Sequence, residues 1–517
     1  MDSVVYDLSS QTEAEPNIFI KKDFVSILDN QNANYSGNQC VIDTSQLSNS
    51  NKWIGYREGY LTIPMQLCLT TATASNTFNP TAANSVDYGV GLKNWYGSII
   101  HSISVDLGGT TIIQQTPFQS LWNNFKLLTT LSYQDLLTIG PSIGFYPDNS
   151  SSWSYNSAAS VYGSIGVSNN VNNFIAPVVT GAANSLEQSN TGMYQRQKLW
   201  NFNTAGLTGV GQSAFSSLIS QSNLNTIFKS QIILIGAGIW QANIVATVFL
   251  RHLHMFFDKM PLCKGVFMKI TLNLNNTSVA FNATTGRVMS QTQGSSQFPL
   301  GGVNPILISS AVAGSGMAAL QVGVATDFNV SLSVGGSVLD APSKARTPAT
   351  GQLLNITLTV PSYTFNPIYE QAYLSNPVRK IDYEDIYQYQ VLNVNAGGTF
   401  NNLITNGIAG IKSVLVIPFH SAVTAVNNAI SPLQSAFDSA GGGTTSPLTF
   451  INNFNVVISG QNSLYNSQRY TYEEFLNQLN GQNGVNGSQI DGMSSGLISQ
   501  YDFESSYNYY YVNVERC

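Results

Sequence analysis

The sequence predicts an all-β protein made of two tandem antiparallel β-sandwiches, with short helices and long loop insertions. Three observations support this prediction: apolar residues recur with a period of two, helical patterns are few and short, and a strand–turn–helix pattern occurs twice. At 517 residues the chain is longer than one ordinary domain, which favours two large domains or three small ones with a sizeable buried core.

The period of two is clearest in three segments. Along 60–71 one face of the expected strand carries Leu61, Ile63, Met65, Leu67 and Leu69. Residues 98–113 repeat the alternation around a tight turn at Gly108 and Gly109, and 266–274 shows it again. Further strands are expected at 353–360, 411–418, 453–459 and 507–514.

Only two segments have a helical pattern. "FQSLWNNFKLL" places Leu121, Trp122, Phe125 and Leu128 on one stripe, and "TYEEFLNQL" begins with Thr471 and Glu474 at the spacing of a capping box. Each follows a strand and a glycine turn at nearly equal spacing, which suggests two related sandwiches in tandem.

The domain boundaries follow from this repeat. We expect an N-terminal arm at 1–50, a first sandwich at 51–275, a linker at 276–302 that is rich in Asn, Thr, Ser and Gly, and a second sandwich at 303–517. Far fewer residues follow the glycine turn in the second half than in the first. Either the loops differ greatly or a closing strand is missing, and the abrupt end "YYYVNVERC" favours the missing strand.

The surface is expected to be polar but nearly uncharged. Only 9% of residues are charged, well below the average of roughly 25%, and the formal net charge is -6. This balance argues against an electrostatic grip of the whole protein on nucleic acid, although Lys21 and Lys22 could form a local basic patch or a solvated turn.

The cysteines and the apolar segments indicate no special compartment. Cys40, Cys68, Cys263 and Cys517 form no CxxC pair and have no zinc spacing, which favours reduced thiols. The chain begins without the pattern of a secretory signal. The apolar run 231–250 is interpreted as buried strands joined near Gly236 and Gly238, and no transmembrane segment is expected.

The strongest candidate for chemistry is "LRHLHMFFDKMPLCKG", residues 250–265. In a strand, His252 and His254 would point to one face and could bind one metal ion together with Asp258. The spacing, with Gly265 after it, is similar to the first metal motif of the cupins. However, Ala246 stands where the motif has glycine, and the next histidine, His420, lies far along the chain. A structural role for these imidazoles is therefore favoured.

Other candidates also have simpler explanations. His101 lies on an apolar strand face, where a core histidine is expected. Gly236 and Gly238 lack the third glycine of a dinucleotide fingerprint, because Gln241 stands there. Asp382, Glu384 and Asp385 could do acid–base work but are expected to form a solvated strand end. We therefore assign no catalytic, cofactor-binding or metal-binding residue and expect no cofactor.

Several segments in order resemble the double jelly-roll major capsid proteins of small eukaryotic DNA viruses, especially polinton-like viruses and virophages. The segments are "IKKDFVSILDNQNANYSGNQCVIDTSQLSNSNKWIGYREGYLTIPM", "NWYGSIIHSISVDLGGTTI", "LRHLHMFFDKMPLCKGVFMKITLNLN", "NPIYEQAYLSNPVRKIDYEDI", "NGIAGIKSVLVIPF" and "YTYEEFLNQLNGQNGVNG" followed by "SGLIS". The resemblance implies that 250–274 is strand, turn and strand at the end of the first of two eight-stranded jelly rolls.

The resemblance also implies a non-enzymatic, structural function in the virion. Such proteins form homotrimers with a pseudo-hexameric outline, and these capsomers tile an icosahedral shell. The implied partners are neighbouring capsomers, penton (vertex) proteins and minor or cement capsid proteins, without sequence-specific nucleic-acid binding. Residues 141–225 and 420–450 are expected to be surface or interface loops, and an arm from Met1 to about Tyr35 is expected at the inner face.

Two alternatives remain open at this stage. One is a cupin-like, metal-dependent β-sandwich enzyme, which metal analysis would reveal. The other is a glycan-binding spike or adhesin, suggested by 25 tyrosines and 6 tryptophans, although these aromatic residues are more simply explained as filling two large cores.

Overall fold

We analysed a computed structural model of the chain. The structure describes residues 17–35, 38–71, 88–91, 95–117, 119–147, 197–199, 233–236, 239–274, 277–284, 288–293, 306–309, 327–335, 355–376, 378–391, 394–395, 397–404, 407–408, 410–418, 451–464, 469–480, 495–505, 507 and 509–514. Most of the expected loops 141–225 and 420–450 lie outside this set.

The larger sheet has nine antiparallel strands. Its central part runs in the order β1 (Phe19–Leu28), β16 (Thr357–Phe365), β4 (Tyr60–Thr71) and β10 (Ile239–Phe249). The remaining strands are β3 (Trp53–Ile54), β9 (Ile233–Gly236), β12 (Thr277–Thr284), β13 (Val288–Gln293) and β15 (Asp327–Val334). Within this sheet β1 pairs with β16 along its length, although more than 300 residues separate them in the chain.

The second sheet has four antiparallel strands in the order β2 (Gln39–Asp43), β11 (Met268–Leu274), β6 (Ile100–Leu107) and β7 (Thr110–Ile113). The hairpin between β6 and β7 turns at Gly108 and Gly109, which both have positive φ, as the sequence predicts. A smaller sheet joins β14 (Ile306–Ser309), β5 (Tyr88–Gly91) and β8 (Gln197–Leu199).

The predicted alternation explains why the two main sheets pack together. Along β11 the burial alternates, with Met268, Ile270, Leu272 and Leu274 fully buried. Leu61 and Ile63 of β4 are also fully buried and belong to the same hydrophobic core. Since successive side chains of a strand face opposite sides, one apolar face of each sheet is removed from water.

Helices cover the ends of this sandwich. The short ones are α2 (Ser45–Ser48), η1 (Tyr56–Glu58) and η2 (Tyr96–Ile99), and the longer ones are α3 (Gln119–Thr130), α4 (Tyr133–Ile143) and α12 (Pro367–Leu374). A capping box between Ser132 and Asp135 starts α4, and Gly144 in the left-handed conformation ends it. The helix predicted around Phe125 is confirmed, since α3 contains this residue.

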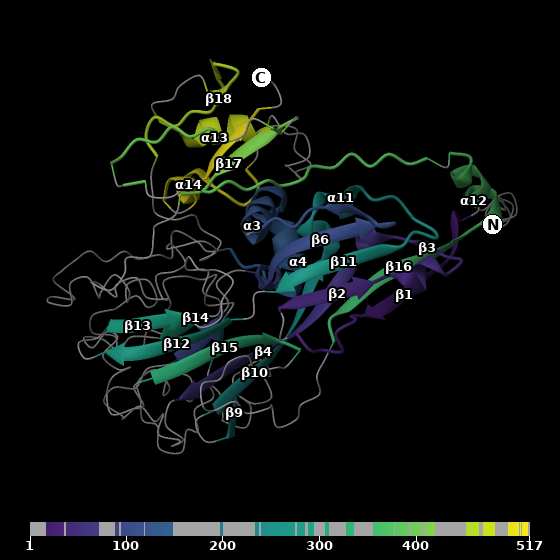
Figure 1. Ribbon diagram of the computed structural model, residues 1–517, viewed down its shortest axis with the longest axis horizontal. Helices are drawn as coiled ribbons and strands as arrows, with labels where there is room; N and C mark the ends of the chain where they lie inside the picture. The colour runs from purple at the N-terminus through teal and green to yellow at the C-terminus, as the bar shows by residue number, and fades with distance from the viewer. Residues whose placement is uncertain are drawn as a thin grey trace, which may run out of the picture.

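A second unit follows at residues 411–514. It contains β17 (Ser413–Val416) paired with β20 (Tyr510–Asn513), β18 (Val457–Ile458) paired with β19 (Gln461–Asn462), and the helices α13 (Tyr472–Asn480) and α14 (Gln500–Ser505). Its aromatic core contacts α3, where the Phe125 ring stacks on Tyr511 at 5.4 Å. An extended strap, defined here as residues 378–404, runs from α12 across the first unit towards β17 (Figure 1).

The architecture differs from the sequence expectation at three places. The expected arm 1–50 contains β1, which pairs with β16 in the larger sheet, and β2, which pairs with β11 in the second sheet. The expected linker 276–302 contains the hairpin β12–β13. Strands β15 and β16, expected in the second sandwich, complete the larger sheet of the first. Apart from the local hairpin β12–β13, these pairings join segments far apart in sequence, and local composition carries no signal for them.

The apolar run 231–250 forms the antiparallel strands β9 and β10, as predicted. Among the described residues, none of the helices combines the length and apolar character needed to cross a bilayer.

Candidate functional site

The segment that carries the two neighbouring histidines is helical. Strand β10 ends at Phe249, and the chain continues as α10 (Leu250–Leu253) and α11 (Met255–Lys259). The expectation of strand, turn and strand is therefore corrected: two short helices stand before β11. Because the backbone is not extended at His252, the two imidazoles do not share a strand face.

His252 lies in an aromatic environment. Its ring centroid is 5.4 Å from the Phe249 ring and 6.4 Å from the Trp95 ring, both in edge-on arrangements. Its Nδ1 is buried without a hydrogen-bond partner. Burial, reinforced by the neighbouring Arg251, lowers the pKa of His252 to about 4, so the imidazole is neutral at physiological pH.

His254 has a different, fully structural set of contacts. Its side chain caps α11, because Nδ1 accepts a hydrogen bond from the Phe256 N–H at 3.1 Å. Since Nδ1 is an acceptor, the neutral ring carries its proton on Nε2, which lies 3.4 Å from Oδ1 of Asp385. The side chain of His254 is 1% exposed, so both ring nitrogens are committed inside the protein.

The other residues considered for a cupin-like metal site lie apart from the two histidines or have other contacts. Asp258 pairs with Arg57 at 3.2 Å, Ala246 is buried in β10, and Gly265 occupies a turn with positive φ. His420 falls outside the described residues. Within the described ranges, no three His, Cys, Asp or Glu side chains are grouped so that they could hold a metal ion. The residues at this position do not fit a cupin-type metal centre.

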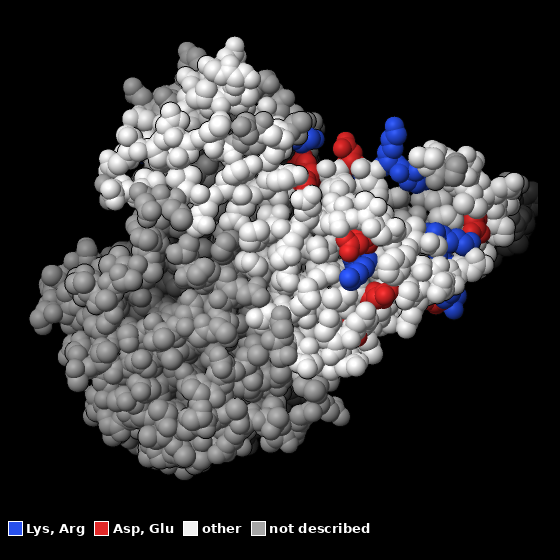
Figure 2. Space-filling model, viewed as in Figure 1, with Lys and Arg blue, Asp and Glu red and all other residues white. Residues whose placement is uncertain are grey.

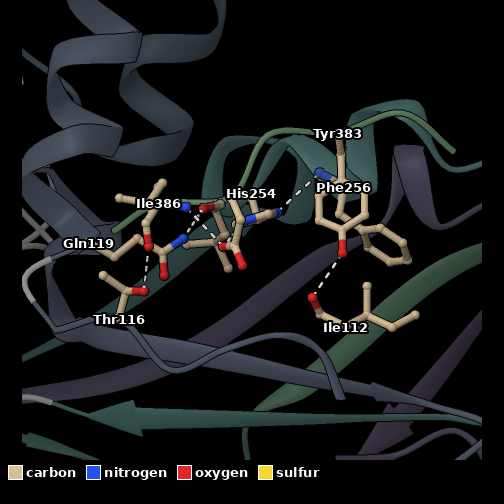
Figure 3. Close-up of polar contacts among 9 residues, drawn as sticks. Ile112, Thr116, Gln119, His254, Phe256, Tyr383 and Ile386 are labelled. Atoms are coloured by element: carbon tan, nitrogen blue, oxygen red, sulfur yellow. Dashed lines mark hydrogen bonds and ion pairs between the residues drawn. The ribbon is translucent and has the colours of Figure 1, made fainter. Parts of the chain in front are cut away.

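His254 contributes to the binding site of the strap on the first unit. We call this site the seat of the strap and define it as the contacts of residues 383–386 with the first unit. The Tyr383 ring of the strap packs against His254 and Phe256, with ring centroids 5.9 and 5.3 Å apart. Its hydroxyl donates a hydrogen bond to the Ile112 carbonyl at 2.9 Å. Figure 3 shows these contacts between α11, the end of β7 and the strap. Burial raises the pKa of the Tyr383 hydroxyl, which stays a neutral donor.

The strap is fixed at one further point beside Tyr383, next to a hydrogen bond within the strap itself. The Thr116 hydroxyl donates to the Ile386 carbonyl at 2.7 Å, and Oδ1 of Asp385 accepts from the Ile386 N–H at 2.9 Å (Figure 3). Below them, the buried Gln119 amide donates to the Leu253 carbonyl at 2.7 Å and ties α3 to α10. Residues 383–386 are thus locked onto the first unit.

The three acids of "IDYEDI" do not converge. Asp385 binds His254, Glu384 lies 3.7 Å from Lys412 at the start of the second unit, and Asp382 is exposed. The segment forms no strand, so the expected solvated strand end is corrected to a non-strand segment held by specific contacts. No local motif marks Tyr383, Thr116 and Gln119, because their partners are remote in sequence.

The other sequence candidates have structural surroundings. His101 is buried on β6, and burial lowers its pKa. Lys21 and Lys22 are paired with Asp23 and Glu58, at 3.0 and 2.6 Å. Gly236 ends β9. Among the described side chains, Cys40 and Cys263 are free thiols, and burial raises the pKa of Cys263 to about 11.

Comparisons with known proteins give only distant matches. No protein-family model matches the chain. No curated protein matches it either. Among solved structures, a cryo-EM structure of the Sputnik virophage matches with a TM-score of 0.30 and 9% identity, over 69% of this chain and 50% of that chain. The Faustovirus major capsid protein matches with a TM-score of 0.27 and 11% identity, over 72% of this chain and 60% of that chain. The chain thus spans about half to three-fifths of the solved chains that it matches.

Proposed function

We propose that this chain is a major capsid protein with a double jelly roll, which forms trimers of pseudo-hexameric outline that tile an icosahedral virus shell. The role is structural and not enzymatic, and the location is the capsid of the virion. The strand order of the first unit is the observation that carries the proposal, and the family resemblance of the sequence agrees with it.

Eight strands of the first unit follow the plan of a jelly roll. β1, β4, β10 and β16 lie in one sheet, and β2, β6, β7 and β11 lie in the other. Along the chain the strands alternate between the sheets, except at the β6–β7 hairpin. Two four-stranded antiparallel sheets connected in this way are typical of jelly rolls, which include viral capsid domains. The first jelly roll would then span 19–365.

The second unit supports a tandem duplication. Strand β6, the glycine turn and α3 in the first unit correspond to β18, Gly460 and α13 in the second, and Gly460 also has positive φ. The equivalent phenylalanines Phe125 and Phe475 contact each other at 6.5 Å between ring centroids. In this proposal, the second jelly roll begins in the strap.

The strap provides surface for contacts between subunits. Beyond its seat, the chain from 386 to 404 has no charged residue. Its exposed large apolar side chains are Tyr387, Tyr389, Val391, Val394, Phe400, Leu403 and Ile404. Such a concentration of exposed apolar groups is characteristic of an interaction surface. Neighbouring capsomers, penton proteins and minor or cement proteins are the partners that this role requires.

The two alternatives receive less support. The histidines of the cupin hypothesis are committed to other contacts, as described above. A glycan-binding spike needs exposed aromatic rings, and the strap exposes Tyr387, Tyr389 and Phe400. However, Trp53 and Trp95 are buried, and among the described residues all of the largest fully buried side chains are aromatic. This favours the interpretation that the aromatic residues fill the cores.

The assembly is tested by measuring the mass of the purified full chain in solution. Sedimentation equilibrium or mass photometry should give three times the chain mass of 55.8 kDa. Introducing charge into the strap by Tyr389→Glu and Leu403→Glu should shift the protein towards monomer, and Tyr133→Glu, at a 70% exposed position on α4, serves as the control. A monomeric wild type at micromolar concentration would contradict the proposal.

A further inference from the structure

Among the described residues, charged side chains lie mainly on the first unit. On the described part of the face seen in Figure 2, Lys, Arg, Asp and Glu lie over the first unit towards α12, and the described part of the second unit shows few. Figure 1 places α12 and the first described residues at one end of the long axis. We call this end the α12 tip and define it as residues 17–20, 262–266 and 366–380.

The α12 tip exposes aliphatic side chains together. Ile18, Ile20, Ile368, Leu374 and Val378 are 51%, 66%, 71%, 52% and 71% exposed. Their segments are neighbours, because the Asn366 N–H that precedes α12 donates to the Ile18 carbonyl at 3.0 Å, and Val378 follows α12 closely. Single exposed aliphatic residues need no explanation, but five on one protruding tip indicate a contact surface.

The α12 tip also carries three cations, Lys264, Arg379 and Lys380. Arg379 stacks on the Tyr373 ring at 4.1 Å and donates to the Tyr373 carbonyl at 2.7 Å, so its guanidinium is held in place. Lys380 is exposed and has no ionic partner among the described residues. Lys264 pairs with Glu370 at 2.9 Å, and Glu370 is the only acid in the described part of the tip. The tip therefore has a net positive charge on a chain whose net charge is -6.

The tip is firmly supported by the first unit. Trp53 donates its indole N–H to Glu370 at 2.9 Å, and its ring packs edge-on against Tyr373 at 5.1 Å. The Tyr373 hydroxyl reaches the Leu262 carbonyl at 3.3 Å. These contacts attach α12 to the first unit, so the exposed aliphatic side chains are not needed to hold the helix in place.

We propose that the α12 tip binds the surface of an anionic lipid bilayer. Exposed aliphatic side chains on the same tip as Lys and Arg suit the boundary between head groups and acyl chains, where apolar groups insert and cations meet acidic head groups. Nucleic-acid phosphates would use the cations alone and give the exposed aliphatic side chains no role. This inference does not depend on the proposed capsid function.

The test is co-sedimentation of the full chain with vesicles of phosphatidylcholine containing about 30% phosphatidylserine, a typical anionic composition. We expect binding to these vesicles and much weaker binding to pure phosphatidylcholine. The double variant Arg379→Gln, Lys380→Gln should lower the affinity roughly thirtyfold, because each of the two cations near an anionic surface contributes about 1 kcal/mol. The double variant Ile368→Ser, Val378→Ser should lower it by a similar factor.

Two matched controls separate the tip from general surface effects. Lys269→Gln with Arg469→Gln removes two exposed cations outside the tip, and Val245→Ser with Val457→Ser removes two exposed aliphatic side chains of other strands. Both control variants should bind like the wild type. Equal effects of tip and control variants, or no vesicle binding at all, would overturn the proposal.

A parallel titration with a DNA duplex of random sequence tests whether the α12 tip binds nucleic acid and not lipid. If the charge variant weakens DNA binding but the aliphatic variant changes neither DNA nor vesicle binding, the tip is a nucleic-acid surface and the lipid proposal is wrong. Vesicle binding is measured whatever the oligomeric state. A monomer that binds vesicles would therefore contradict the trimer and support this inference.

Discussion

At the residue scale, the two histidines that suggest a metal site are both explained by packing. His254 caps a helix and contacts Asp385, whereas His252 is held neutral among aromatic rings. The sequence favoured a structural role for them, but it could not assign the contacts. Whether two histidines share a face depends on the local backbone, and the helices α10 and α11 replace the expected strand.

The neutral state of His252 makes stability depend on pH. Its folded pKa of about 4 lies below its ordinary value of 6.5, so the unfolded chain binds more protons between these values. The contribution is lost as pH falls from about 6.5 to 4, and it can reach on the order of 3 kcal/mol. We expect His252→Phe, which keeps an aromatic ring, to flatten the decline of Tm between pH 7 and pH 4.5.

The comparison at pH 7.5 is the control for this variant, because both proteins should there have a neutral side chain and a similar Tm. An unchanged acid sensitivity of His252→Phe would contradict the assignment.

The seat of the strap gives a second residue-scale prediction. Tyr383→Phe removes the hydrogen bond to the Ile112 carbonyl and keeps the ring contacts, so it should lower the free energy of unfolding by about 1 kcal/mol. Tyr387→Phe on the same strap is the matched control, because this residue is exposed, and it should have little effect. Denaturant titration measures both, and equal effects would show that the seat does not hold the strap.

At the element scale, period-two alternation predicted the strands that form the sandwich. β4, β6, β7 and β11 all appear at the expected segments, because each has one apolar face that must be buried, and β10 appears in the apolar run 231–250. The two helices around Phe125 and Phe475 were also correctly placed.

The pairing of distant segments could not be predicted in the same way. β1 contains both exposed and half-buried apolar residues, and only its pairing with β16 makes it part of the sheet. The hairpin β12–β13 is rich in Ser, Thr and Asn and therefore has the composition of a linker. The pairings of β1 with β16 and of β12 with β15 depend on backbone hydrogen bonds between distant segments, which leave no local pattern.

Because β1 is a strand of the larger sheet, deleting the expected N-terminal arm should destabilise the protein. Deleting 1–28 would remove β1 and expose Leu358 and Val360 of β16, which are fully buried, so the protein should lose several degrees of Tm or fail to fold. Deleting 1–16 keeps β1 and should leave Tm nearly unchanged. If both deletions behave alike in thermal denaturation, β1 is not an integral strand.

The junction of the two units depends on one glycine. Gly496 has a φ of +68°, and a Cβ there would lie 2.5 Å from the Leu128 carbonyl oxygen of α3, next to the 2.8 Å hydrogen bond from the Leu497 N–H to the same oxygen. Gly496→Ala should therefore destabilise the protein by about 2 kcal/mol or more. Gly407→Ala, where a Cβ meets no atom, is the control in the same denaturation experiment.

At the scale of the whole molecule, low charge determines how copies should associate. With only 9% charged residues and an uncharged strap beyond the seat, contacts between copies would consist of amides, hydroxyls and apolar groups, which salt screens weakly. We expect the trimer affinity to change by less than about threefold between low and physiological ionic strength. A steep salt dependence in sedimentation would mean that ion pairs hold the copies together.

Electron microscopy of the purified full chain tests the central claim most directly. The double jelly-roll proposal predicts class averages with threefold symmetry, a pseudo-hexagonal outline and a hollow centre. Compact monomers or twofold dimers at the same concentration would contradict the capsomer assignment and leave only the β-sandwich fold.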